Sequence, residues 1–294
     1  MVDGDWRVWT LWFACGIVIG AAESVPGASG ASLAMVLGVY AALLRGIGAN
    51  RDAAFRMVGI VCLGIVVGVA LLGGFLSEML INCPVALRAF CFGFLACAIA
   101  LIGARQTWRF DGWVTLMLGA MVGATLSRVE LVATASPLNT FVHAMCASVG
   151  MLLPGGMGWA RLVTDSVAIH ASLGVGLSTS WVLIAFGAGA ILGTVLGARL
   201  IATLLQRFPI ALWAFLLGMA LNGLSRLWPW QRIDAYTLTI GGDIVAMATT
   251  PLSPWQYSAT TGADAGLTQA CVLMLLAGLL AWRCTRQPSV VTSH

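Results

Sequence analysis

Apolar residues fill most of the chain in long stretches that more polar segments interrupt. Six of these stretches are long enough to cross the ~30 Å hydrocarbon core of a bilayer as α-helices. They cover residues 55–76, 85–104, 112–128, 181–205, 209–227 and 265–282. Because backbone in lipid must satisfy its own hydrogen bonds, this pattern predicts an all-α polytopic membrane protein with six transmembrane helices.

Two further apolar regions, 8–47 and 138–177, are broken near their middle by Pro and Gly. The first break covers residues 23–30 and the second residues 154–158. Irregular backbone at membrane depth is tolerated only where protein or water covers it. We therefore predict two re-entrant helical hairpins. The alternative is a pair of short full spans with a Pro kink.

The chain also repeats itself. The pattern P-x-A-L-x-A-F-x-x-G occurs at residues 84–93 and again at 209–218, and a Pro-Gly break lies at a similar distance before each copy. Each half then contains one hairpin and three crossings, and an odd number of crossings inverts the second half. We predict a first repeat over 1–130 and an inverted second repeat over 131–294.

The placement of Arg residues predicts the orientation. One side of the predicted membrane holds Arg45, Arg51, Arg56, Arg105, Arg109, Arg207, Arg283 and Arg286, and the other holds Arg128, Arg226 and Arg232. Cytoplasmic loops carry the excess of basic residues. We therefore expect a multi-pass protein of a bacterial inner membrane with both termini in the cytoplasm. The polar connection 229–264, with Trp230, Trp255 and Tyr257, is expected to form an interfacial cap on the outer face.

Composition supports this class and excludes others. Of the residues, 60% are hydrophobic and only 9% are charged, against about a quarter charged in soluble domains. The net charge of +4 gives no case for a nucleic-acid partner. With three His, eight Cys without CxxC spacing and no GxSxG or HExxH motif, we expect no metal site, no cofactor and no enzymatic activity.

The few polar residues at membrane depth are the candidates for function, because burying charge in lipid is costly. Glu23 precedes the first break and is interpreted either as a proton-exchanging carboxylate or as a cap for loop amides. Arg161 and Asp165 follow the second break at helical spacing. They form either a phosphate-binding pair or a structural ion pair. Arg88 is either a ligand or a residue that snorkels to the interface.

The first loop has features of an anion site. Gly-rich backbone before a helix presents amides, and hydroxyls add donors. The predicted substrate-binding set is completed by Ser24, Gly27, Ser29, Gly30, Ser32, Gly155 and Arg226. His143 and His170, one on each arm of the second hairpin, are interpreted as packing residues.

Three segments resemble the PopT-type undecaprenyl-phosphate translocases. Residues 20–40 resemble the V-P-G-V-S-G-G-T signature and its apolar arm ending G-I-Y, and residues 145–158 resemble A-M-x-L-P-G-I-S-G-S. Residues 218–230 are similar to G-x-x-x-G-S-x-x-x-W-P-W. The second loop departs from the family, because Gly156-Met157-Gly158-Trp159 replaces I-S-G-S, and Ala31-Ser32 replaces G-T in the first.

This resemblance implies recycling of the C55 lipid-carrier phosphate from the outer to the cytoplasmic leaflet, in support of peptidoglycan and other envelope polymers. As a hypothesis, Glu23 or Asp165 takes up a proton and couples it to head-group movement. The expected partners are thus a lipid phosphate, the membrane and protons, while the oligomeric state stays open. The alternatives are a secondary transporter of a small anion, an intramembrane enzyme that cleaves a lipid phosphate, and a scaffold.

Overall fold

The computed structural model describes residues 6–48, 52–106, 108–126, 137–155, 180–238 and 244–286. Every apolar stretch predicted to cross the membrane forms a helix within these ranges. The elements are α1 (Trp6–Glu23), α2 (Gly30–Val36), α3 (Tyr40–Gly48), α4 (Asp52–Asn82), α5 (Pro84–Ala104), α6 (Phe110–Leu126), α7 (Pro137–Leu152), α9 (Ser180–Arg207), α10 (Pro209–Arg226), β1 (Gln231–Leu238), β2 (Ile244–Pro251), α11 (Pro254–Thr261) and α12 (Leu267–Arg286).

The helices confirm a polytopic membrane protein. Four of them, α4, α5, α9 and α12, are long and apolar enough to cross a bilayer, and the bent pair α2 and α3 is a fifth candidate if it counts as one span. Large apolar side chains such as Phe75 and Leu275 are exposed on α4 and α12, as on a lipid-facing surface.

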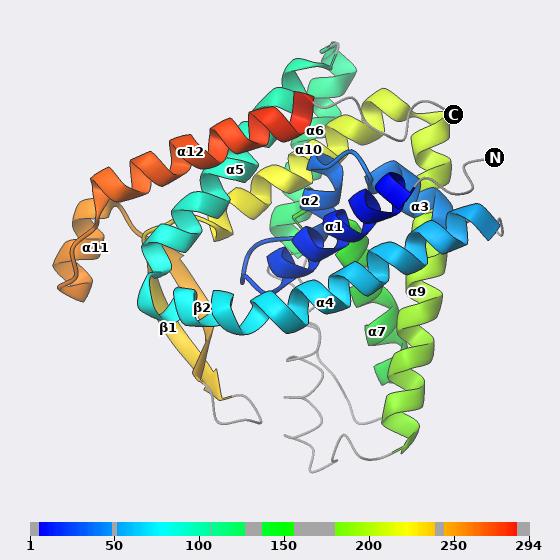
Figure 1. Ribbon diagram of the computed structural model, residues 1–294, viewed down its shortest axis with the longest axis horizontal. Helices are drawn as coiled ribbons and strands as arrows, with labels where there is room; N and C mark the ends of the chain where they lie inside the picture. The colour runs from blue at the N-terminus through cyan, green and yellow to red at the C-terminus, as the bar shows by residue number, and fades with distance from the viewer. Residues whose placement is uncertain are drawn as a thin grey trace.

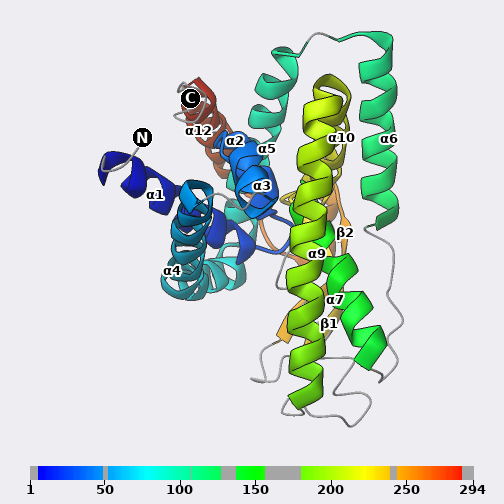
Figure 2. The same ribbon diagram turned by 90° about the vertical axis from the view of Figure 1, so that its right-hand side faces the viewer.

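The longest helices run in different directions. In Figure 1 α4 runs across the view and in Figure 2 it is seen end-on, whereas α9 stands upright in both. The 31 residues of α4 extend ~46 Å at 1.5 Å per residue. That length exceeds the hydrocarbon core, so α4 either tilts or reaches beyond it.

Glycines bring the first arm of each hairpin against the next long helix. A Cβ atom on Gly64 of α4 would lie 2.4 Å from the carbonyl oxygen of Phe13 in α1, and one on Gly189 of α9 would lie 2.3 Å from that of Phe141 in α7. Only glycine allows backbones to approach this closely. The register of these contacts makes α1 parallel to α4 and α7 parallel to α9.

The remaining long helices pair across the two halves of the chain, α5 with α12 and α6 with α10. A Cβ atom on Gly93 would lie 2.5 Å from Met274, and one on Gly218 would lie 2.0 Å from the carbonyl oxygen of Leu116. Figure 2 shows α6 beside α10. Both pairs are parallel, since Gly278 lies next to Cys97 and Gly123 next to Met219.

The first apolar region differs from a simple hairpin. Its first arm is α1, but its second arm is split into α2 and α3, which are bent by 117° at the break between them. Gly38 at this break has a φ of +73°, a conformation that other residues rarely adopt. With 7 and 9 residues, each piece is too short to span a bilayer. Of the second hairpin the structure describes the first arm, α7, and the loop as far as Gly155.

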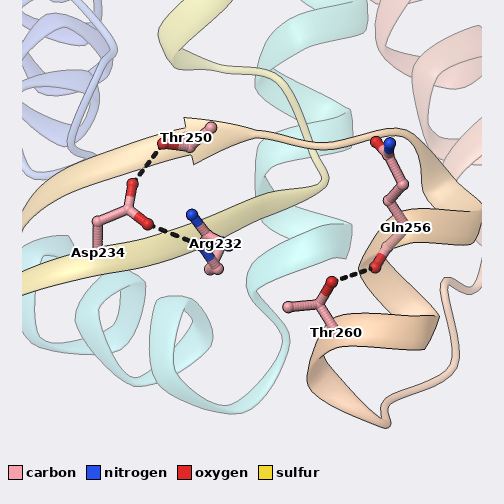
Figure 3. Close-up of polar contacts among 5 residues, drawn as sticks. All are labelled: Arg232, Asp234, Thr250, Gln256 and Thr260. Carbon is pink, nitrogen blue, oxygen red and sulfur yellow. Dashed lines mark hydrogen bonds and ion pairs between the residues drawn. The ribbon is translucent and has the colours of Figure 1, made fainter.

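The connection 229–264 holds structure that the sequence did not predict. β1 and β2 form an antiparallel pair, so the described fold is helical with a small two-stranded sheet. Figure 3 shows that Asp234 accepts hydrogen bonds from the hydroxyl of Thr250 and from Arg232, the latter at 2.7 Å. These two bonds hold the pKa of this exposed carboxyl below its usual range. In the same view Thr260 donates to the backbone oxygen of Gln256 within α11.

Candidate functional site

The first loop begins at Glu23, the last residue of α1, and ends at Gly30, the first residue of α2. Oε1 of Glu23 accepts a hydrogen bond from the backbone N–H of Gly30 at 2.7 Å. A Cβ atom on Gly30 would lie 2.6 Å from this oxygen, so a larger residue there would displace the carboxylate. This arrangement is the cap for loop amides, one of the two interpretations of Glu23. Its role in proton exchange stays a prediction.

The hydroxyls of this loop point in different directions. Ser29 and Ser32 are buried, with 6% and 1% of their surface exposed. Oγ of Ser32 accepts a hydrogen bond from the backbone N–H of Gly155 at 3.1 Å. Ser24 instead donates to the carbonyl oxygen of Gly20 in its own helix. Ser32 therefore joins the first loop segment to the second.

A second hydrogen bond links the two hairpins. The hydroxyl of Tyr40, at the start of α3, donates to the carbonyl oxygen of Leu152, the last residue of α7, at 2.7 Å. Tyr40 is 3% exposed, and its ring lies 6.3 Å from that of Trp213 in α10. The sequence did not identify Tyr40 as a candidate, although a hydroxyl in an apolar arm is itself a signal.

Both loops rest on α10. Gly27, with a φ of +94°, lies against the backbone of Arg226, whose carbonyl oxygen would be 2.9 Å from an added Cβ atom. Gly155, with a φ of +72°, lies against Met219, whose carbonyl oxygen would be 2.2 Å from a Cβ atom added to Gly155. The side chain of Asn222 fixes α10 to α6 by donating to the carbonyl oxygen of Gly123. The C-terminal half of α10 is thus the platform on which the two hairpins meet.

Arg88 lies on α5 beneath the connection 229–264. Its neighbour Leu87 belongs to the main core, which includes Val25 and Ala28 of the first loop. Its other neighbour, Ala89, packs instead with Trp230 of the connection. Arg88 therefore lies between the loop and the cap.

The other candidates are outside the described residues: Arg161, Asp165, His170 and the altered segment 156–159. Within the described ranges, no three His, Cys, Asp or Glu side chains lie close enough to hold a metal ion. The described part of the site offers buried hydroxyls, a capped carboxylate and the end of α10.

Comparison with known proteins gives one family and one relative. Residues 19–245 match the VCA0040-like family, described as undecaprenyl phosphate translocase-like. The chain is 24% identical over 281 residues to a polyprenyl-phosphate transporter of Vibrio cholerae, a match that covers 89% of this chain and 91% of the relative. No solved structure matches the chain. The matched family and the relative are transporters rather than enzymes.

Proposed function

Since the chain belongs to the undecaprenyl phosphate translocase-like family, we propose that it carries undecaprenyl phosphate from the outer to the cytoplasmic leaflet for reuse in envelope polymer synthesis. The family match extends over both loops, over Arg88 and over Arg226. The Vibrio cholerae relative is named for transport of a polyprenyl phosphate. The membrane in question is the bacterial inner membrane, with both termini in the cytoplasm.

The observation that carries this proposal is the junction of the two loops on α10. Ser32 accepts from Gly155, and Tyr40 donates to Leu152, so two hydrogen bonds join the hairpins among the described residues. Hydrogen bonds of this kind contribute about 1 kcal/mol each. Breaking these two bonds therefore costs little, and alternating access to a shared site requires a junction that can open.

The helix pairs support an inverted repeat around this junction. In the predicted topology α5 and α12 run from outside to inside, and α6 and α10 run in the opposite direction. The parallel pairings of α5 with α12 and of α6 with α10 agree with these directions. Each half then supplies one hairpin, and the two hairpins open to opposite sides of the membrane.

We propose that transport is coupled to protons through the hydrogen bond between Glu23 and Gly30. An ionised Glu23 occupies the N–H of Gly30, and a charged acceptor binds an amide more strongly than a neutral one. When Glu23 takes up a proton, this bond weakens, and the Gly30 amide becomes available to the phosphate. The proton also offsets the negative charge of the head group. The hydroxyls of Ser29 and Ser32 and the side chain of Arg226 complete the proposed contacts, with Arg161 and Asp165 supplied by the second hairpin.

The test is a liposome assay with the purified protein, following the access of outer-leaflet undecaprenyl phosphate to the interior. We expect transport by the wild type, a loss of at least tenfold in Glu23→Gln, and no change in Glu78→Gln, which alters an exposed carboxylate of α4. Uptake of inorganic phosphate without lipid transport would instead favour the small-anion transporter. Equal lipid transport by wild type and Glu23→Gln would overturn the role of Glu23.

A further inference from the structure

Arg88 is a buried cation that the described protein does not neutralise. Its side chain is only 7% exposed, and the described ranges provide neither a hydrogen bond nor an ion pair for its guanidinium. Burying an unpaired charge costs several kcal/mol, and buried charges in proteins are normally paired. A bound anion supplies the partner that this arginine lacks among the described residues.

The fold does not itself require an arginine here. The repeated pattern P-x-A-L-x-A-F-x-x-G places Arg88 in its first copy and Trp213 in its second. Trp213 packs its ring near Tyr40 and supports α10 without any charge. Since an apolar residue serves the same helical position in the other copy, the charge of Arg88 has a purpose other than packing.

The surroundings of Arg88 suit a head group. Tyr257 of α11 packs against the cluster that contains Ala89, the neighbour of Arg88 in α5. One turn along α5, Phe92 meets Trp228 edge-on, with ring centroids 5.4 Å apart. Trp228 is two residues from Arg226, which touches Gly27 of the first loop. Arg88 therefore lies on the part of α5 that contacts the segment leading back to Arg226 and the loop junction.

Two hydrogen bonds from tryptophan side chains attach the cap near Arg88. The indole N–H of Trp228 donates to the carbonyl oxygen of Leu252, and that of Trp230 donates to the carbonyl oxygen of Ala265, both at 2.8 Å. These bonds tie the two tryptophans to the residues that flank α11 on either side. Because the Arg88 side chain is only 7% exposed, its guanidinium has little contact with bulk water, and this strengthens its attraction for an anion.

We propose that Arg88, beneath the cap formed by the Trp228–Trp230 pair and α11, binds a phosphate monoester before it reaches the loop junction. This inference rests on the proposed function, since it adds an entry site on the same path. Arginine binds phosphate with two parallel N–H donors. The same chemistry accepts a lipid phosphate or inorganic phosphate, and the experiment separates these sources.

The test compares wild type, Arg88→Met and Arg88→Lys in detergent by equilibrium binding and thermal unfolding. The probes are geranylgeranyl phosphate, geranylgeraniol and inorganic phosphate. Arg105→Met, an exposed position at the other end of α5, is the matched control. We expect Arg88→Met to bind geranylgeranyl phosphate at least tenfold more weakly, Arg88→Lys to bind with intermediate affinity, and Arg105→Met to bind like the wild type. Geranylgeraniol, which lacks the phosphate, should show no dependence on Arg88.

Thermal unfolding separates this site from a structural role. Without ligand, Arg88→Met should unfold at the same or a higher temperature than the wild type, because an unpaired buried charge has been removed. It should also lose the rise in unfolding temperature that geranylgeranyl phosphate gives the wild type. A lower unfolding temperature without ligand, or unchanged binding, would overturn the proposal while leaving the transport function intact. Wild type that binds inorganic phosphate through Arg88, but no geranylgeranyl phosphate, would support the phosphate site and overturn the lipid function.

Discussion

Single residues at the loop junction act in two ways. Small residues allow neighbouring atoms to approach closely, and polar residues supply hydrogen-bonding partners. Gly30 is small enough for Glu23 to reach its amide, and Gly27 and Gly155 adopt positive φ values where the loops touch α10. Ser32 supplies the acceptor that the buried amide of Gly155 needs. An amide buried without a partner costs more than the bond itself is worth.

Replacing Ser32 with Ala should therefore destabilise the junction. The change removes the acceptor and leaves the N–H of Gly155 buried, so we expect a loss of about 1–3 kcal/mol in the free energy of unfolding. The measurement is thermal or denaturant unfolding in detergent. Ser225→Ala is the control, because that exposed hydroxyl donates only within its own helix. Equal stability of the two variants would show that the Ser32 contact contributes little.

The sequence identified Glu23 and Ser32 because polar residues are conspicuous in an apolar region. It could not identify their partners. Ser32 and Gly155 are 123 positions apart, and no periodicity relates one loop to the other. The burial of Arg88 was equally hidden, because its enclosure depends on the cap folding back over α5. Long-range contacts of this kind follow from the tertiary fold and not from local pattern.

At the scale of elements, each of the six apolar stretches predicted to cross the membrane is found as a helix, and the ends agree to within four positions except at α4, which continues six residues further. Length and apolarity determine these helices, because a chain in lipid has few other ways to satisfy its backbone. The bend between α2 and α3 was missed, because the apolar run passes through it unbroken. Gly38 was the signal for it. The pair of β1 and β2 was also missed, although Ile233, Tyr236 and Thr237 are typical of strands.

The contact between α1 and α4 provides a matched pair of glycines on one helix. Gly64 is buried, and an added Cβ atom would lie 2.4 Å from the carbonyl oxygen of Phe13, whereas Gly59 has nothing within 4 Å. Gly64→Ala must push the helices apart, so we expect it to lower stability by about 1–3 kcal/mol. Gly59→Ala should be neutral or stabilising by up to about 1 kcal/mol. Unfolding measurements on both variants test this, and equal effects would contradict the close approach.

At the scale of the whole molecule, helices of the first half of the chain pair with helices of the second half. The second and third long helices of the first half, α5 and α6, pair with α12 and α10 of the second. Neither half therefore completes its own helix packing, and the two must fold together. The α5–α12 and α6–α10 pairs are both parallel, in agreement with the predicted topology. In that topology the turn between α4 and α5 faces the outside, and the end of α12 faces the cytoplasm.

Two native cysteines allow this orientation to be tested without adding a probe site. Cys83 is exposed at the turn between α4 and α5, and Cys284 lies near the end of α12. A membrane-impermeant maleimide should label Cys83 in right-side-out spheroplasts and Cys284 only in inside-out vesicles, because thiols within the hydrocarbon do not meet the reagent. Cys83→Ser should lose the first signal and Cys284→Ser the second, which separates them from the other cysteines. The opposite pattern would reverse the orientation, and labelling of both from one side would contradict the predicted odd number of crossings between them.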